Sequence, residues 1–287
     1  LWYADLATNR VGKLHECQPG EIIGHEYWYA DGKRIGQLGS ALAPDLVREC
    51  YEGSFDLGDG TKRVKILFPW AACSKLMALT LDDGASFAPV QKEKTIILFG
   101  DSITQGYDAA IPENSYASQL VAALDANGIN KAIGGEIFRP ELATLPDKGF
   151  EPDYITVAYG TNDWNNAPNS WGEPLKENTD INTTFGAINE IVRLLLTTYP
   201  HLVIYWFTPT VRWAASLAER TDDTWSDNFK KNNTTLKEFS ADVEDLVKLH
   251  HIPICDMYNT LGWNQYNFSQ YFADNDGTHP RKGKGTE

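Results

Sequence analysis

The pattern of hydrophobic and polar positions changes its character near residue 92. Before this point, short strand-like runs alternate with turn residues; the runs cover positions 26–30, 55–57, 63–69 and 76–81. Asp and Gly residues follow three of these runs, which is typical of tight turns between antiparallel strands. The pattern therefore predicts a small N-terminal β-sandwich domain, jelly-roll-like, over residues 1–92.

After residue 92, apolar runs alternate with amphipathic segments of helical periodicity. The apolar runs, which are typical of strands buried on both faces of a parallel sheet, cover positions 95–99, 154–159, 202–207 and 252–256. Ser115 can cap a first helix that stops at Gly128, a second helix has Ile181 on its apolar face, and a third begins near Leu236. Residues 93–287 are therefore expected to form an α/β domain whose ligand site lies beyond the carboxyl ends of parallel strands.

The amino-acid composition is that of a folded chain and limits the classes of partner that we expect. Hydrophobic residues occupy 42% of the 287 positions and charged residues 22%, which is typical of a globular protein and not of a disordered one. The formal net charge of −14 would repel polyanions, so we expect no nucleic-acid partner. No apolar run reaches the roughly 20 residues that a membrane span needs.

The cysteines and the N-terminus indicate a compartment. The four cysteines, Cys17, Cys50, Cys73 and Cys255, are widely spaced and form no Cys-x-x-Cys pair. This spacing favours free thiols in a reducing compartment over a zinc site or a disulfide framework. The chain begins at Leu1 without a basic and apolar leader, so a cytoplasmic location is expected, with secretion after removal of a signal as the alternative.

Four polar clusters carry the candidate chemistry, and each is expected after a strand. They are GDSITQG at 100–106, NKAIGGE at 130–136, YGTNDW at 159–164 and DGTHP at 276–280. Each cluster alone is typical of an ordinary turn or helix start. Together they supply a hydroxyl nucleophile, amide donors and an Asp-x-x-His pair at one edge of a sheet, which is the inventory of acyl transfer.

These clusters, in this order, resemble the four blocks of the SGNH/GDSL family of serine hydrolases, over roughly residues 94–279. The resemblance implies a flavodoxin-like three-layer α/β/α sheet and an ester hydrolase that needs no cofactor and no metal. It makes Ser102 the nucleophile, His279 the general base and Asp276 the residue that orients the imidazole. It also implies an oxyanion hole built from the backbone N–H groups of Ser102 and Gly135 and from the side chain of Asn162.

Two details of the blocks bear on this interpretation. The spacing Asn-x-x-x-x-Gly before an acidic residue favours Gly135 over Gly134 as the oxyanion glycine, because a backbone N–H approaches most closely where no Cβ intrudes. Many family members carry Gly where this chain has Ala132. Relatives usually continue into a helix after the fourth block, so we expect some apolar surface of the sheet to be uncovered.

Other catalytic classes fit less well. An α/β-hydrolase would carry Gly where Thr104 stands two residues after the nucleophile, and the interval from Gly100 to Gly106 does not fit a dinucleotide-binding turn. A metal site formed by Asp163, Asp276 and His279 lacks support from a second histidine motif. We therefore expect neither metal nor cofactor.

The substrate is expected to be a small-molecule or carbohydrate ester with a short acyl group, most plainly acetyl. The predicted N-terminal β domain resembles the layout of two-domain carbohydrate esterases, and the chain has no long apolar lid for water-insoluble esters. Asp101, Trp164 and Trp213, with Trp206, are the candidate substrate-binding residues, because tryptophans near strand ends can stack on sugars; simple packing is the equal alternative. A lysophospholipase or thioesterase with the same triad, and a non-catalytic carbohydrate-binding protein, stay open.

Overall fold

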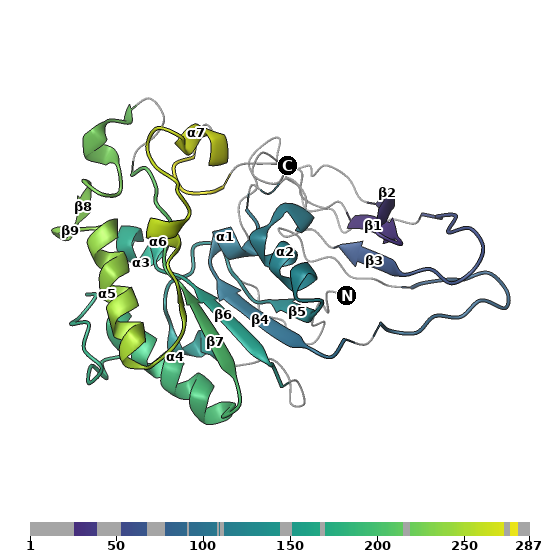
Figure 1. Cartoon of the computed structure of the whole chain (residues 1–287), viewed down its shortest axis with the longest axis horizontal. Coiled ribbons are helices and arrows are strands. Elements are labelled where there is room, and N and C mark those ends of the chain that lie inside the picture. The colour runs from purple at the N-terminus through teal and green to yellow at the C-terminus, as the bar shows by residue number, and fades with distance from the viewer. Residues whose placement is uncertain are drawn as a thin grey trace.

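The chain forms a five-stranded parallel sheet with helices on both faces, beside a small antiparallel sheet (Figure 1). The computed structural model describes residues 26–38, 53–67, 78–90, 92–107, 109, 112–143, 151–166, 170–214, 219–272 and 276–280. Cys17, Cys50 and Cys73 lie outside the described residues, whereas Cys255 carries a free thiol.

The order of the parallel strands determines where a ligand site can form. The strands are β4 (Thr95–Gly100), β5 (Asn127–Asn130), β6 (Tyr154–Ala158), β7 (Val203–Phe207) and β10 (Ile254–Cys255). Their order is β10-β7-β6-β4-β5, and all neighbours are parallel. The chain leaves β4 on one side for β5 and returns to its other side for β6, so a topological switch point lies between the carboxyl ends of β4 and β6. This is the flavodoxin-like order, and the predicted fold class is confirmed.

Helices cover the sheet in two layers (Figure 1). Helices α4 (Thr184–Thr198) and α5 (Leu236–Leu249) lie on one face, and α2 (Tyr116–Ala123) lies on the other. The shorter elements are α1 (Ser102–Gln105), α3 (Thr161–Asn166), α6 (Met257–Thr260), α7 (Phe268–Tyr271), the 3₁₀ turns Pro112–Asn114, Pro140–Ala143 and Asp222–Thr224, and the strand pair β8 (Lys230–Lys231) and β9 (Thr234–Thr235). No helix in the described ranges is long and apolar enough to cross a bilayer.

Strand β4 shows why its sequence is continuously apolar. Successive side chains point to opposite faces of a sheet. Ile97 therefore belongs to the core beneath α4 and α5, while Ile96 and Leu98 pack with Val121 of α2. All three β4 side chains are at most 1% exposed, so both helical layers depend on this strand.

Side-chain caps begin the three long helices where the sequence provides them. The hydroxyl of Ser115 accepts a hydrogen bond at the start of α2, as predicted, and the hydroxyl of Thr183 does the same for α4. Helix α5 has a full capping box, in which Thr235 and Glu238 each accept from the other's backbone N–H. These caps fix the helix starts because they satisfy N–H groups that have no partner within the helix.

Two predicted helix boundaries are wrong. Gly128 does not end α2 but lies inside β5, where glycine is needed because a Cβ would lie 2.4 Å from the side chain of Val121. Ile181 is not part of the apolar face of α4; it precedes the Thr183 cap and is 52% exposed. Both errors have one cause, since periodicity alone does not show where the backbone leaves the helix.

One face of β7 is only partly covered. Ile204 and Trp206 are at most 3% exposed, whereas Val203 and Tyr205 on the opposite face are 38% and 41% exposed. The sheet therefore keeps apolar surface open to solvent on the side of α2.

The N-terminal part contains an antiparallel sheet of order β2-β1-β3, formed by β1 (Glu26–Ala30), β2 (Lys33–Leu38) and β3 (Val64–Leu67). The turn Asp31-Gly32 has positive φ at both residues, which suits a tight hairpin. The predicted run at 55–57 is not a strand; instead the ring of Phe55 packs on Trp28 with centroids 5.1 Å apart. Antiparallel N-terminal strands are thus present, while the full sandwich and the boundary at residue 92 stay predictions.

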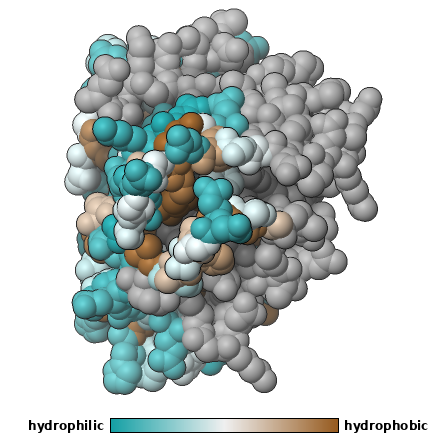
Figure 2. Space-filling view, turned by 90° about the vertical axis from the view of Figure 1, so that its right-hand side faces the viewer, coloured by the Kyte–Doolittle hydropathy of each residue, from teal (hydrophilic) through white to brown (hydrophobic). Residues whose placement is uncertain are grey.

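The surface on this side of the molecule is mixed. Figure 2 shows apolar residues gathered in a central recess, with hydrophilic residues around them. Two exposed apolar side chains lie on the extended segment 78–90, Leu79 at 41% and Phe87 at 70% exposure.

Candidate active site

The structure brings the four predicted clusters to one edge of the parallel sheet. Ser102 begins α1 directly after β4, and Asn162 lies in α3 directly after β6. The glycine pair at 134–135 follows β5, and Asp276 and His279 follow α7. The site therefore lies at the switch point that the strand order creates.

Ser102, His279 and Asp276 form a continuous hydrogen-bonded chain. Ser102 Oγ lies 2.7 Å from His279 Nε2, and His279 Nδ1 lies 2.5 Å from Asp276 Oδ2. A carboxylate at Nδ1 favours the tautomer with its proton there, which leaves Nε2 to accept the proton of the serine hydroxyl. The arrangement has the geometry of a nucleophile, its base and an orienting acid.

Asp276 is fixed by more than the histidine. Its Oδ1 accepts from the backbone N–H of Thr278 at 2.6 Å and of His279 at 3.1 Å. Burial alone would raise the pKa of Asp276, but the hydrogen bond and charge of His279 and these two N–H groups lower it to about 2. The carboxylate is therefore ionised at any pH at which an esterase would work.

Trp213 stabilises the loop that carries Asp276 and His279. Its backbone N–H donates to the carbonyl of Gly277 at 2.9 Å, and a Cβ on Gly277 would lie 2.6 Å from the carbonyl oxygen of Trp213. The indole is only 9% exposed and packs edge-on against Trp225 and Phe268. The proposed sugar contact of Trp213 is therefore corrected to a packing and positioning role.

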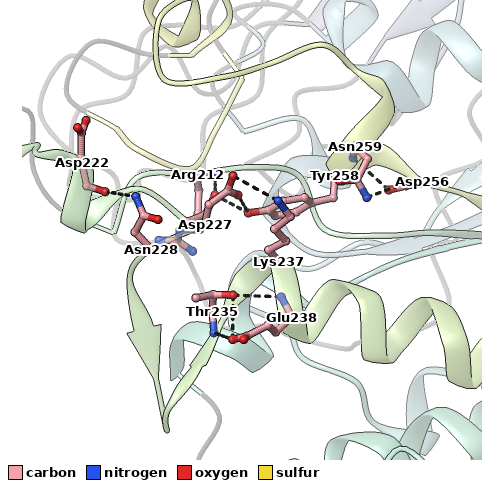
Figure 3. A network of polar contacts seen from close by, with 11 residues as sticks. Arg212, Asp222, Asp227, Asn228, Thr235, Lys237, Glu238, Asp256, Tyr258 and Asn259 are labelled. Atoms are coloured by element: carbon pink, nitrogen blue, oxygen red, sulfur yellow. Dashed lines mark hydrogen bonds and ion pairs between the residues drawn. The ribbon is translucent and has the colours of Figure 1, made fainter.

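The segment of Trp213 is itself tied to the protein interior. Ser226 Oγ accepts from the backbone N–H of Arg212 at 3.3 Å. The Tyr258 hydroxyl donates to the Asp227 carboxylate at 2.5 Å and lies within hydrogen-bond distance of Ser226 Oγ, at 2.8 Å. Figure 3 shows the surrounding network, in which Asp227 also faces Lys237. These contacts fix the Arg212–Trp213 segment, which in turn fixes the loop of His279.

Asp101, a candidate substrate-binding residue, caps α1. Its Oδ1 accepts from the backbone N–H of Ile103 at 2.9 Å, and the residue is 2% exposed. Burial raises the pKa of Asp101 to about 6, against the opposing effects of the Ile103 N–H and of the charges of His279 and Arg212. The cap explains how the sequence Gly-Asp-Ser turns directly from strand into helix and presents Ser102 at its first position.

Asn162 connects the second and third clusters. Its Nδ2 donates one hydrogen bond to the carbonyl of Glu136 at 3.0 Å, and an amide nitrogen carries two hydrogens. The neighbouring Asp163 is fully buried and accepts from the backbone N–H of Phe138 at 3.1 Å. Asn162 and Asp163 thus fix the loop after β5, and the second hydrogen of the Asn162 amide can serve another acceptor.

The two glycines of this loop are needed for different reasons. The backbone N–H of Glu136 donates to Ile133 at 3.1 Å, and Gly135 at the third position of this turn has a φ of +77° that favours glycine. A Cβ on Gly134 would lie 3.7 Å from Ser102 Cβ, whereas a Cβ on Gly135 would meet nothing within 4 Å. The turn therefore favours glycine at position 135, and Gly134 is the glycine nearer to the side chain of Ser102; the choice of Gly135 as the oxyanion glycine stays a prediction.

Trp164 and Trp206, two further tryptophans that were expected to contact a sugar, belong to the hydrophobic core. Trp164 is 1% exposed and its Nε1 donates to the carbonyl of Thr234 at 3.1 Å. Trp206 is fully buried and stacks on Phe138 with ring centroids 5.6 Å apart. Neither indole offers a face to a sugar, so the packing alternative is correct for both.

Sequence reasoning missed a partly buried cation in the site. Arg212 Nη1 donates to the Thr161 hydroxyl at 3.0 Å, next to Asn162. Burial lowers the pKa of Arg212 to about 10, while the charges of Asp276 and Asp101 raise it, so the guanidinium stays charged. No motif contains this arginine, and a charged residue two positions after a Pro-Thr pair gives no sequence signal.

Sequence reasoning also missed a partly aromatic cavity of about 290 Å³ next to α1, lined by Asp101 and Ile103 but not by Ser102, Asp276 or His279. Its lining includes Tyr107, whose ring lies against the His279 imidazole with centroids 4.3 Å apart, and Trp263 and Tyr271 from the segment before Asp276. The signal that could have found these residues is the density of aromatics in the 20-residue connection between β10 and Asp276.

The described part of the chain shows no set of side chains that could serve as metal ligands. Among the described residues, no group of three or more His, Cys, Asp and Glu side chains is arranged to hold an ion. Asp163, offered as a ligand in the metal alternative, is bonded to the Phe138 backbone.

Comparison with known proteins agrees with this geometry. The family model of the GDSL-like lipases and acylhydrolases matches residues 98–282. No curated protein has a sequence similar enough to match.

Solved structures share the fold at low sequence identity. The salicylyl-acyltransferase SsfX3 from a tetracycline biosynthetic pathway is 17% identical, with a TM-score of 0.65 over 92% of this chain and 71% of that one. A family two carbohydrate esterase from Clostridium thermocellum, solved with cellohexaose, is 16% identical, with a TM-score of 0.54 over 90% of this chain and 80% of that one. A Lactobacillus plantarum protein is 19% identical, with a TM-score of 0.52 over 66% of this chain and 88% of that one.

Proposed function

Because the chain belongs to the GDSL-like lipase/acylhydrolase family and is an SGNH-type serine esterase, we propose that it removes short acyl groups, acetyl above all, from carbohydrate esters. The observation that carries the proposal is the chain Ser102–His279–Asp276, with separations of 2.7 and 2.5 Å. A hydroxyl at this distance from a neutral imidazole is positioned to lose its proton as it attacks a carbonyl.

The reaction then runs through an acyl-enzyme. Ser102 Oγ forms a bond to the ester carbonyl carbon while its proton passes to His279 Nε2, and the carbonyl oxygen becomes an oxyanion. The tetrahedral intermediate collapses with cleavage of the bond to the alcohol oxygen, which takes the proton from His279. Water repeats the steps in the deacylation half: it gives a proton to His279 Nε2 as its oxygen bonds to the acyl carbon. The bond from that carbon to Ser102 Oγ then breaks, Oγ takes the proton back from His279, and the acid is released.

Three donors are proposed for the oxyanion: the backbone N–H groups of Ser102 and Gly135 and the second hydrogen of the Asn162 amide. The bond from Asn162 to Glu136 at 3.0 Å supports this proposal, because it fixes the direction of the remaining hydrogen. Fixed donors need no reorganisation as charge develops, and the loss of one typically costs about 2.7–4 kcal/mol of transition-state stabilisation.

The carbohydrate part of the proposal has two supports. The likeness to the two larger neighbours extends over 90–92% of the chain, which is more than the family-model match at residues 98–282. One of these neighbours is described as a carbohydrate esterase in complex with cellohexaose. The acetyl part follows from the sequence, which has no long apolar lid segment.

A chain-length series tests the acyl preference. We expect kcat/KM on 4-nitrophenyl esters to be highest for acetate and to fall steadily with longer acyl groups. Acyl-CoA thioesters and a lysophospholipid are measured in parallel, since a thioesterase or lysophospholipase would use the same triad. An optimum beyond about eight carbons, or a preference for either of these two substrates, would contradict the acetyl proposal.

A further inference from the structure

Two hydrogen bonds hold the His279 imidazole, and they leave the ring on opposite sides. Nδ1 faces Asp276 Oδ2 at 2.5 Å, and Nε2 faces Ser102 Oγ at 2.7 Å. A rotation of the ring about the line between these two partners changes the length and straightness of either bond little. The bonds therefore fix the place of the imidazole but not the tilt of its plane, which needs a contact on a face of the ring.

Tyr107 supplies such a contact. The centroids of the Tyr107 and His279 rings lie 4.3 Å apart, with 42° between the ring planes. Aromatic pairs usually lie about 4.5–7 Å apart, so this separation brings the rings together over their faces and not edge to edge. The side chain of His279 is only 17% exposed, so the phenol ring stands where solvent would otherwise reach the imidazole.

The Tyr107 ring is attached to the segment that carries the nucleophile. Gly106 ends α1 with a φ of +102°, and the backbone N–H groups of Gly106 and Tyr107 both donate to the Ser102 carbonyl, at 3.1 and 2.9 Å. The base comes from a loop 177 positions later in the chain. The contact between the two rings therefore aligns the imidazole with the same helix end that presents Ser102.

The contact should become stronger as the reaction proceeds. His279 is neutral before the attack and becomes an imidazolium when it takes the proton of Ser102. The face of an aromatic ring attracts a cation within about 6 Å of its centroid, and the Tyr107 ring meets this condition. An interaction that is stronger in the transition state than in the bound substrate complex raises kcat and leaves KM unchanged.

We propose that Tyr107 is a positioning residue for the general base: its ring fixes the plane of the His279 imidazole and favours the imidazolium that forms as Ser102 attacks. The proposal rests on the proposed function, because it assumes that His279 accepts the proton of Ser102. The backbone bonds at the end of α1 do not depend on the side chain at position 107, so variants there change the ring and keep the helix end.

The test compares Tyr107→Leu, which removes the ring, with Tyr107→Phe, which keeps it, in steady-state hydrolysis of 4-nitrophenyl acetate. We expect kcat to fall about tenfold in Tyr107→Leu with KM within about twofold of wild type, and Tyr107→Phe to keep about half of the wild-type kcat or more. Tyr107→Met, also without a ring, is measured in parallel, so the comparison does not depend on the folding of one variant. Tyr266→Leu is the matched control, because Tyr266 is 88% exposed, and it should leave both constants unchanged.

The outcomes separate this inference from the proposed function. If the wild type hydrolyses no ester and a fluorophosphonate does not label Ser102, the proposed function is wrong. If the wild type is active and the variants without a ring keep its kcat, or if Tyr107→Phe loses as much as Tyr107→Leu, the role of the ring is contradicted. A rise in KM at unchanged kcat would also overturn it, because such a result assigns Tyr107 to substrate binding.

Discussion

Asp276 gives its two oxygens to different partners, and both contacts serve His279. Oδ2 faces Nδ1 of the ring at 2.5 Å, and Oδ1 holds the backbone of the loop through Thr278 and His279. The ring is therefore fixed in position by one oxygen and in orientation by the other. An amide at position 276 could still hold the backbone but would offer the wrong group to Nδ1.

Asp276→Asn should accordingly lower kcat by about 10²–10⁴-fold and leave KM nearly unchanged, because the imidazole would lose its orienting acceptor and not its place. The measurement is steady-state hydrolysis of 4-nitrophenyl acetate. Asp256→Asn is the control, since Asp256 is a carboxylate that caps α6 through the Asn259 N–H and touches no catalytic residue. A loss as large as that of Ser102→Ala would mean that Asp276 does more than orient the ring.

At the scale of single residues, the sequence predicted the site residues that belong to motifs and missed the site residues that do not. Ser102 and His279 are 177 positions apart, yet their blocks predicted the pair; Ser102 follows β4 of the parallel sheet, whereas the block of His279 follows α7. Arg212 and Trp263 lie in segments without a motif. The residues that contact Arg212 and Trp263 depend on how two long connections fold over the edge of the sheet. Hydrophobic periodicity does not predict the path of such connections.

At the scale of elements, the histidine loop depends on a contact between two connections. The Trp213 N–H bonds to the Gly277 carbonyl, and the close approach leaves no space for a side chain at position 277. The Tyr258–Ser226 pair fixes the Arg212–Trp213 segment on its other side. The position of the base is thus set by chain that follows β7 and not by the sheet alone.

Gly277→Ala should therefore displace the loop and lower kcat by about 10²-fold, since a shift of about 1 Å in a catalytic group costs that much. Gly262→Ala is the control: it adds backbone strain at a φ of +69°, but its Cβ meets nothing within 4 Å. The two variants are compared by kcat and by melting temperature. Equal kcat losses in both, or an unchanged kcat in Gly277→Ala, would show that the contact does not position His279.

Elements were predicted well where burial determines the sequence and poorly elsewhere. The apolar runs of β4, β6 and β7 were located to within a residue or two, because strands covered on both faces leave no room for polar positions. A strand was expected to end at the 130–136 cluster, and β5 does end at Asn130, but its start was not located, because Gly128, which fits closely against Val121, is typical of a helix stop. In the N-terminal part, the run around Phe55 is apolar because its ring packs on Trp28, and not because it is a strand.

At the scale of the whole molecule, stability should depend on a buried acid that serves the site. Burial raises the pKa of Asp163 to about 7, against the lowering effect of the Phe138 N–H. In the unfolded chain this carboxyl ionises near its ordinary pKa of 3.8, whereas the folded protein keeps it protonated up to about pH 7. The contribution of Asp163 to the free energy of unfolding therefore falls as pH rises from about 4 to about 7.

Asp163→Asn stays neutral at every pH, so its stability relative to wild type should improve between pH 5 and pH 8. The measurement is the free energy of unfolding in urea at both pH values, with the exposed Asp83→Asn as the control. A difference between Asp163→Asn and wild type that is the same at pH 5 and pH 8 would contradict the shifted pKa.

The whole molecule also combines the N-terminal and C-terminal parts, which the hydrophobic pattern distinguishes near residue 92. The family match begins at residue 98, but the structural likeness to the two larger neighbours extends over 90% or more of the chain. The likeness in fold therefore extends beyond the residues that the family model matches. The sequence of the N-terminal strands predicted hairpins, since Asp31-Gly32 is a local signal, but not how many strands pair, which depends on contacts distant in sequence.

The central claim is that Ser102 is an activated nucleophile, and covalent labelling with a fluorophosphonate tests it most directly. Intact mass and peptide mapping of the full chain should show one adduct, on Ser102, in the wild type and none in Ser102→Ala. His279→Ala should label far more slowly, because the base is gone while the serine remains. An adduct on another residue, or equal labelling of Ser102→Ala, would contradict the account.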